Sequence, residues 1–383
     1  MDTLTNLPGV KIQEVMLGAP PIAGVGTSTP AFVGKAPKAG TFKNILRLVT
    51  SPDQFAIDYV GNATKSTALS YAVNGFFQNG GGSCYVVNVD SVDAADVVAG
   101  IKLLETSDKA QIIAAPGSTD ATVYQALEDQ ATRLGDRFAI LDPPAKVGAL
   151  TSLIKGGDKR PKDSIWAAFY YPQIQVAPAL KDDPQDTVAE PIYVTPTGHI
   201  AGVYARVDGL RGVHKAPANE LLLGALGVEH LLTDSDQDAL NKDGVDVIRV
   251  FSAGPVLWGA RTLLVDDAPD KTFRYLNVRR LTTYVEQSLK VGLRFAVFEP
   301  NNLPLRQTIT RSVRGFLDGV WRDGALFGAA ASDAYYVRFP DVYNTDADRA
   351  LGKLTVEVGI RVSYPAEFII VRIGLLMQSA SAA

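Results

Sequence analysis

Side chains that could exchange protons are grouped at one place in this sequence. His214-Lys215 is followed by Asn219-Glu220 within the glycine-rich stretch 196–224, and such a set could supply the acid and base of an α/β enzyme. The same residues could equally form a hydrogen-bonded turn before a helix expected over about 217–224, and we favour this interpretation. No Gly-x-Ser-x-Gly, kinase or His-Glu-x-x-His motif occurs, so we expect no enzyme and no catalytic residue.

Metal and cofactor sites are weakly indicated. His199, His214 and His230 are not spaced one helical turn apart, and Cys84 lies far from them in an apolar, strand-like run. A metal site needs three or four convergent ligands. Gly24-Val25-Gly26 lacks both the third glycine and the preceding long strand of a dinucleotide site. We therefore expect no metal and no cofactor.

The composition is that of a globular chain without a strong electrostatic bias. Of the 383 residues, 46% are hydrophobic and 20% are charged, and the net charge is −4. This length predicts two or three domains, and the mild negative charge does not favour nucleic acid as a partner. No apolar stretch approaches the roughly 20 residues that span a bilayer. The first residues lack the basic and apolar regions of a signal peptide.

Alternating patterns predict an α/β body with a mixed, partly parallel sheet. Helices are expected from Pro52, which Ser51 caps, and over 69–77, 94–104 and 122–134. Buried strands are expected over 28–34, 84–89, 110–117, 138–142, 167–171 and 245–251. The polar, proline-bearing region 178–190 is expected to be an exposed loop.

The last third predicts an α+β unit, with one helix over 274–291, a strand over 294–300 and a second helix over 303–322. In the second helix, an apolar seam recurs at 3/4 spacing and consists of Ile309, Val313, Phe316 and Val320. The opposite face is mostly basic and consists of Gln307, Arg311, Arg314, Asp318 and Arg322. This face is either plainly solvated or a docking surface for an acidic partner.

Both chain ends have the character of β-strands. Near the C-terminus, apolar and polar residues alternate over 354–363, and a second apolar run follows Pro365. Unpaired strands at chain ends are normally avoided because they recruit partners, so we expect subunits to be joined by donated strands. The residues expected to act between subunits are Val10, Ile12, Val15, Leu354, Val356, Val358, Ile360, Phe368 and Ile370.

Several segments resemble, in order, the motifs of contractile tail sheath proteins. They are Pro8-Gly9-Val10, 29–34, 212–220, 258–263, 275–281, 298–301, 321–326, 358–360 and 365–370. The resemblance covers nearly the whole chain. Its compact length is most similar to the sheaths of R-type pyocins, extracellular contractile injection systems and simple contractile phage tails.

The resemblance implies a mechanical function. Such sheaths polymerise as stacked hexameric rings around an inner tube, and on a baseplate signal they shorten and widen to drive the tube through a target envelope. The implied partners are other copies of the chain, the tube protein, and baseplate and cap or terminator proteins, with no nucleic acid and no membrane insertion. The implied setting is assembly in the bacterial cytoplasm, within a phage tail or tail-like particle released by lysis.

The resemblance also implies a division of the chain. It places an N-terminal arm at 1–24, an outer α/β domain at 25–265, an inner tube-facing α+β domain at 266–352, and a C-terminal strand and arm at 353–383. The basic helix is expected to face the tube, with the 274–291 helix as the alternative. Two other classes stay open, namely an enzyme with a site near His214 and Glu220 and a closed-ring adaptor such as a tail terminator.

Overall fold

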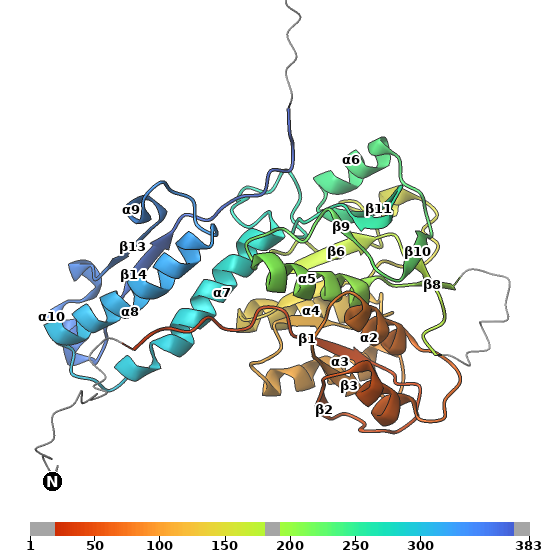
Figure 1. The fold of residues 1–383 in the computed structure, drawn as a ribbon, viewed down its shortest axis with the longest axis horizontal. Helices are drawn as coiled ribbons and strands as arrows, with labels where there is room; N and C mark the ends of the chain where they lie inside the picture. Colours follow the sequence, from red (N-terminus) through yellow and green to blue (C-terminus); the bar gives the residue numbers. More distant parts are fainter. Residues whose placement is uncertain (1–19, 181–191, 371–383) are drawn as a thin grey trace, which may run out of the picture.

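The computed structural model describes residues 20–180 and 192–370, which form two lobes of unequal size (Figure 1). The larger lobe contains a broad sheet with helices on both faces. The smaller lobe contains a long helix and a two-stranded sheet. Helix α7 (Leu276–Gly292) runs from the larger lobe into the smaller one. It is one of the connections between the two.

The sheet of the larger lobe has nine strands in the order β2-β3-β1-β4-β5-β6-β11-β12-β9. Neighbouring strands from β3 to β11 pair in parallel, whereas β2, β12 and β9 pair antiparallel at the two margins. The mixed, partly parallel sheet is therefore confirmed. Its strands are β1 (Pro30–Gly34), β2 (Leu46–Val49), β3 (Cys84–Asn88), β4 (Ile112–Ala114), β5 (Phe138–Leu141), β6 (Ala167–Tyr171), β9 (Glu220–Leu221), β11 (Val245–Phe251) and β12 (Gly254–Leu257).

Helices cover both faces because successive strand residues point to opposite sides. In β1, Phe32 packs into the core beneath α2 and α5, whereas Ala31 and Val33 pack into the core beneath α3 and α4. Burial on both faces explains why these strands are continuous apolar runs. The helices of this lobe are α1 (Pro52–Phe55), α2 (Ala68–Gln78), α3 (Ala94–Leu103), α4 (Ala121–Leu134), α5 (Thr197–Arg211) and α6 (Asp234–Lys242).

Shorter elements complete the larger lobe. A three-stranded sheet has the order β10-β7-β8, with β7 (Ile174–Val176), β8 (Ile192–Val194) and β10 (Ala225–Val228). A π-helical turn η1 spans Ala56–Val60, and 3₁₀ turns are found at η2 (Leu104–Thr106) and η3 (Leu150–Ser152).

The smaller lobe is organised around helix α8 (Leu303–Arg322). The seam expected from the sequence is confirmed, since Ile309, Val313, Phe316 and Val320 are all buried. Burying such side chains contributes roughly 1.5–3 kcal/mol each. The other elements are η5 (Arg294–Ala296), α9 (Ala331–Ala334), β13 (Tyr335–Arg338), η6 (Asp341–Tyr343), α10 (Asp346–Ala350) and β14 (Glu357–Ile360).

Two of the predicted elements are wrong. The segment 217–224 is not helical, because Asn219 and Leu222 donate their backbone N–H groups to carbonyls of β12 and its margin, at 2.7 and 3.0 Å. The segment 294–300 is not a strand. It begins with the 3₁₀ turn η5, and Phe298 then projects fully into solvent with φ 68°. An apolar run without a neighbouring strand to pair with does not form a strand.

Candidate functional site

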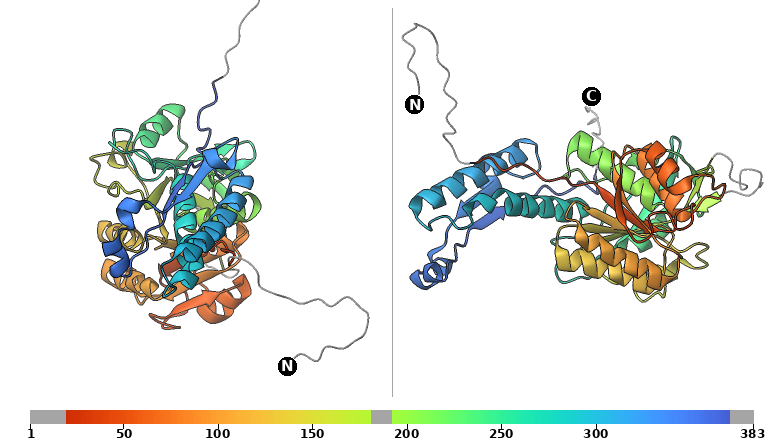
Figure 2. Two further views of the ribbon diagram at one scale, coloured as in Figure 1. Left: turned by 90° about the vertical axis from the view of Figure 1, so that its left-hand side faces the viewer. Right: turned by 90° about the horizontal axis from the view of Figure 1, so that it is seen from below.

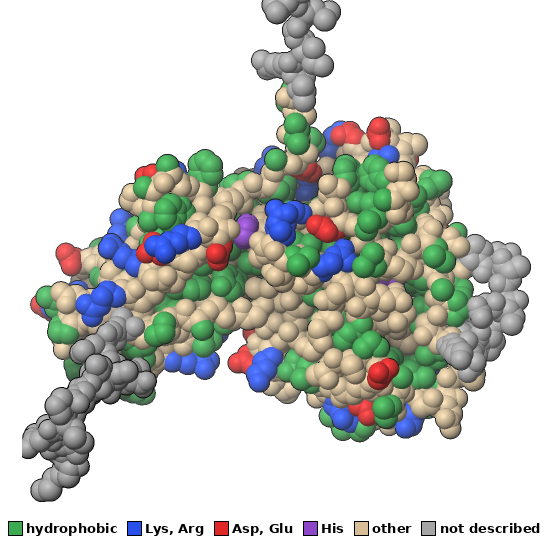
Figure 3. Space-filling model, in the orientation of Figure 1, with side chains coloured by type: hydrophobic (Ala, Val, Ile, Leu, Met, Phe, Trp, Pro, Cys, Tyr) green, Lys and Arg blue, Asp and Glu red, His purple; other side chains and the backbone are tan. Residues whose placement is uncertain are grey.

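The basic face of α8 is open to solvent. Gln307, Arg311, Arg314 and Arg322 are exposed, and Lys and Arg side chains are spread over this lobe in the space-filling view (Figure 3). Asp318 differs from them, because it is half-buried and accepts a hydrogen bond of 2.6 Å from the Tyr335 hydroxyl of β13. Asp318 therefore fastens α8 to the sheet, and the arginines supply the outward charge.

The alternative helix, α7, presents much less free surface. Its first half is buried around Arg279 and Arg280, which lie only 4% and 5% exposed. The Arg279 guanidinium lies between two aromatic rings, 4.3 Å from the ring centre of Trp166 and 4.2 Å from that of Phe273. α7 is a central helix packed by both lobes, so α8 is the better surface for a partner.

Strands β13 and β14 form a sheet of their own. Val337 pairs with Val358, and Tyr335 with Ile360, in antiparallel register. Among the described residues, β13 and β14 belong to a sheet of two strands only. A two-stranded sheet is marginal by itself, and within the described ranges no further named strand pairs with the outer edge of β13 or β14.

The apolar face of the C-terminal alternation packs within its own subunit. Leu354, Val356, Val358 and Ile360 all contact the core that contains the α8 seam. The alternation over 354–363 thus corresponds to a shorter strand, β14 at Glu357–Ile360, whose residues are all half-buried. In this chain that strand pairs with β13 and packs against the core around α8.

The remaining residues of the expected arms lie at the two limits of the structure. Val10, Ile12 and Val15 fall outside the described residues. Phe368 and Ile370 are 72% and 82% exposed and follow the last strand of the smaller lobe. They are thus the first free apolar side chains of the C-terminal segment.

The N-terminal segment, residues 20–29, connects the lobes. Pro20 accepts a hydrogen bond of 2.7 Å from Ser312 of α8, and Val25 donates one of 3.1 Å to Ser288 of α7. Ile22 is buried among the residues of the smaller lobe. The segment follows α7 to β1 in both views (Figures 1 and 2). The described chain therefore enters at the smaller lobe.

The group considered for acid–base chemistry is a structural turn. Lys215 donates to the carbonyls of Ala216 and Ala218 at 2.5 and 3.0 Å and lies 3.6 Å from Glu220. Asn277 of α7 donates to the His214 carbonyl at 2.8 Å. These contacts hold the loop between α5 and β9 against α7, which agrees with the turn interpretation.

The residues considered for a metal or cofactor site are also packed within the protein. His199 and Cys84 are buried, and burial raises the pKa of the Cys84 thiol. Within residues 20–180 and 192–370, no cluster of three His, Cys, Asp or Glu side chains could hold a metal ion. Over the same residues, no helix is both long and apolar enough to cross a bilayer. Gly24 lies directly against the ring of Tyr284, where a Cβ has no room.

The described chain thus combines a large mixed sheet, a separate two-stranded sheet and a basic helix face. Two family models match the chain, the phage tail sheath protein central domain over residues 88–263 and the phage tail sheath C-terminal domain over residues 268–375. The chain belongs to the phage tail sheath protein family.

Individual relatives support this membership. The chain is 30% identical to a chain of the PVC sheath complex, an extracellular contractile injection system in the contracted state, with a TM-score of 0.79 and coverage of 97% of this chain and 98% of that one. It is 31% identical to the helical sheath of the anti-feeding prophage in the contracted state, with a TM-score of 0.77 and coverage of 97% and 99%.

A curated relative is the tail sheath protein of Burkholderia phage BcepMu. It is 27% identical over 297 residues, which are 73% of this chain and 59% of that protein. The chain thus spans about three fifths of the length of this relative. The relatives named here are described as tail or contractile sheaths, none as an enzyme.

Proposed function

We propose that this chain is the subunit of a contractile sheath that polymerises as stacked hexameric rings around an inner tube and contracts to drive that tube through a target envelope. The particle is a phage tail or a tail-like injection device. The observation that carries the proposal is the β13–β14 sheet, which is incomplete in one subunit. The family membership supports the same conclusion.

The sheet is proposed to receive strands from neighbouring subunits. An added strand gains main-chain hydrogen bonds along an open edge. The residues that precede Pro20, with Val10, Ile12 and Val15, are one donor. The residues from Phe368 onward, with Ile370, are the other. Val358 and Ile360 belong to the receiving sheet, and Leu354 and Val356 pack on the core beside it. The donated C-terminal segment is therefore proposed to begin later than the alternation alone predicts.

The proposed roles of the domains follow from these assignments. Residues 25–265 form the proposed outer domain and 266–352 the inner, tube-facing domain, with arms at 1–24 and within 353–383. Donated strands are not returned to the donor's own sheet, so the contacts are head-to-tail. Such contacts generate helical arrays when they do not close.

The tube-facing surface is proposed to be α8. Arg311, Arg314 and Arg322 would meet acidic side chains of the tube protein, with Gln307 beside them. Exposed charges of this kind guide association and register more than they add affinity. The contact is therefore weak enough to break when the sheath widens.

Contraction is proposed to be a change between two lattices of rigid subunits. Each subunit keeps its fold while arms bend at their junctions, as in other rigid-body transitions. A difference of a few kcal/mol per subunit, on the scale of a two-state switch, adds up over a long tube. Baseplate and cap proteins would hold and release the higher-energy lattice.

Electron microscopy of the full chain co-expressed with its tube protein tests the proposal. Striated tubes with sixfold end views are the expected result. Closed rings that never extend into tubes would instead indicate a terminator or adaptor, and dispersed monomers under all conditions would contradict a sheath role.

A further inference from the structure

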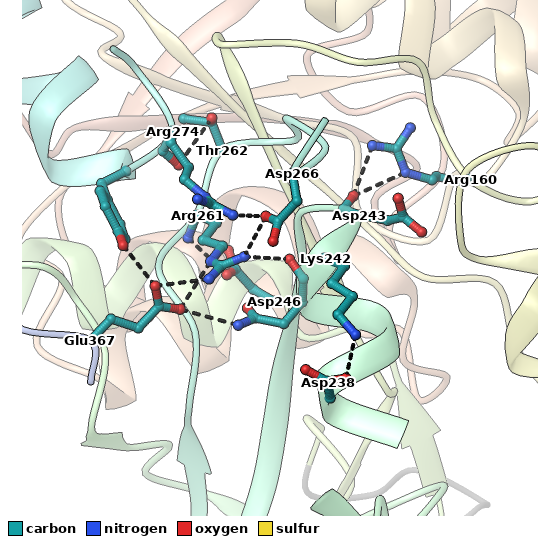
Figure 4. Close-up of polar contacts among 12 residues, drawn as sticks. Arg160, Asp238, Lys242, Asp243, Asp246, Arg261, Thr262, Asp266, Arg274 and Glu367 are labelled. Atoms are coloured by element: carbon teal, nitrogen blue, oxygen red, sulfur yellow. Dashed lines mark hydrogen bonds and ion pairs between the residues drawn. The ribbon is translucent and has the colours of Figure 1, made fainter. Parts of the chain in front are cut away.

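The C-terminal segment is fastened to the larger lobe by one carboxylate. Glu367 accepts two hydrogen bonds from the guanidinium of Arg261, both of 2.9 Å, one from the Tyr275 hydroxyl at 2.8 Å and one from the Asn241 amide at 3.1 Å (Figure 4). A bidentate arginine–carboxylate pair is among the strongest and most directional contacts in proteins. We call these four residues the Glu367 clamp.

Arg261, the main partner of Glu367, is itself held by several hydrogen bonds within the larger lobe. The Arg261 side chain is only 4% exposed, and its backbone N–H donates to Asp246 of β11 at 2.8 Å. The guanidinium also donates to the Asn241 carbonyl at the end of α6 at 2.7 Å and to Asp266 at 3.1 Å. Arg261 is therefore fixed in the nine-stranded sheet and its neighbouring helix before it reaches the tail.

Residues 361–367 form a strap between the lobes. At its start, Phe327 donates to the Arg361 carbonyl at 2.7 Å, and Ser363 donates to the Ala325 carbonyl at 3.1 Å. The ring of Tyr364 then lies edge-on to Tyr275, with centres 6.2 Å apart. The clamp closes the strap at its far end.

The clamp is the last polar anchor of the described chain. Tyr364 and Ala366 are already exposed, and Phe368, Ile369 and Ile370 are 72%, 81% and 82% exposed. Within the described residues, Glu367 is the last to form a side-chain hydrogen bond or an ion pair. This boundary marks where a hinge would lie.

Electrostatics keep Glu367 ionised. Partial burial acts to raise the pKa of Glu367, but the hydrogen bonds from Arg261 and Tyr275 outweigh burial and hold the pKa below its usual value. The attraction to Arg261 is consequently present at neutral pH.

We propose that Glu367 is a positioning residue, which sets the point and direction at which the C-terminal arm leaves its subunit. The inference rests on the proposed function, in which that arm is donated to a neighbour. Without the clamp, the hinge retreats to about residue 364, and residues 364–367 add about 13 Å of slack at 3.3 Å a residue. A longer tether lowers the effective concentration of the arm at the neighbouring sheet.

The test compares the wild-type chain with Glu367→Ala and with Tyr275→Phe, which removes one clamp hydrogen bond and keeps the ring. Asp108→Asn is the matched control. Asp108 is exposed before β4 and has no ion pair or side-chain hydrogen bond within the described part of the chain. Chymotrypsin cleavage after Phe368, the residue next to the clamp, is measured on the subunit, and tube formation is scored with the tube protein.

Glu367→Ala is expected to speed cleavage after Phe368 about tenfold or more, because the segment is then no longer held beside the cleavage site. Tyr275→Phe should give a smaller increase, Asp108→Asn none, and tubes of Glu367→Ala should be fewer and irregular. Unchanged cleavage, or faster cleavage with normal tubes, would overturn the positioning role. A wild-type chain that forms no tubes would overturn the proposed function instead, while the cleavage rates still decide the clamp.

Discussion

Arg280 of α7 and Asp208 of α5 form a doubly hydrogen-bonded ion pair inside the protein. Their oxygen–nitrogen distances are 2.6 and 3.0 Å, and each side chain is only 4% exposed. Thr27 completes the pair, because its hydroxyl donates to Asp208 at 2.6 Å and its carbonyl accepts from Arg280 at 3.0 Å. The pair therefore joins the N-terminal segment, the larger lobe and the connecting helix.

Breaking this pair should weaken the whole subunit. In Asp208→Asn, Arg280 stays buried without its carboxylate, and the free energy of unfolding should fall by about 3–5 kcal/mol. Urea denaturation of the purified subunit measures the change, with Asp108→Asn as an exposed control. A loss below about 1 kcal/mol would mean that the pair does not secure α7.

Reversing charge on α8 should weaken the contact with the tube. Arg311→Glu with Arg314→Glu places two acidic groups on an exposed face, so the subunit should fold normally. Assembly on the tube should decrease and should depend on salt, since exposed charges are screened within about 10 Å at 0.1 M. Cosedimentation at several salt concentrations measures this.

The matched control for α8 is Lys102→Glu. Lys102 is exposed on α3 of the larger lobe, far from the proposed tube surface. If the α8 double variant and the Lys102 variant assemble equally well, α8 is not the tube-facing helix.

Removing the N-terminal arm should separate folding from assembly. A chain lacking residues 1–15 keeps Pro20 and Ile22, which contact the smaller lobe, and should stay folded and soluble without forming tubes. Deletion of 379–383 removes only small residues and should leave assembly intact. Intact tubes from the N-terminal deletion, seen by electron microscopy, would refute donation of that arm.

Protonation of His199 should oppose folding of the larger lobe. Burial raises the pKa of Glu128 and of Asp142 to about 7, which favours folding at lower pH in both wild type and a His199 variant. Burial lowers the pKa of His199 to about 4 from 6.5, so the unfolded chain takes up this proton first. The His199 contribution to the free energy of unfolding should then fall as pH drops from 6.5 to about 4, by about 3 kcal/mol at 1.36 kcal/mol per pH unit. His199→Gln lacks this component, so its stability relative to wild type should rise over the same interval. A constant difference between the two proteins would contradict the assignment.

Local patterns predicted the elements that are buried by simple periodic packing. The strand runs became β1, β3, β4, β5, β6 and β11, and the 3/4 seam became the buried face of α8. Local patterns could not indicate the surroundings of Arg279, since only the tertiary structure supplies the aromatic rings of Trp166 and Phe273. They failed for 217–224, where pairing with β12 decides the conformation.

Local sequence patterns could not predict the Glu367 clamp. Its partners Arg261, Tyr275 and Asn241 are 106, 92 and 126 residues away in sequence. The sequence resemblance did include the segments around Arg261, Tyr275 and Glu367, but nothing in their spacing indicates that they meet. The surfaces that bind other subunits can be identified neither from the spacing of residues in the sequence nor from the structure of one subunit.

The first and last anchored parts of the described chain are held on different lobes. Ser312 holds the incoming chain on α8, whereas Arg261 holds the outgoing chain beside the large sheet. In the proposed sheath, a pull between two neighbours would cross from one lobe to the other through α7, the strap at 361–367 and the segment at 20–29. Since a helix resists stretching through its own ladder of backbone hydrogen bonds, α7 would let the subunit carry that pull without giving up its fold.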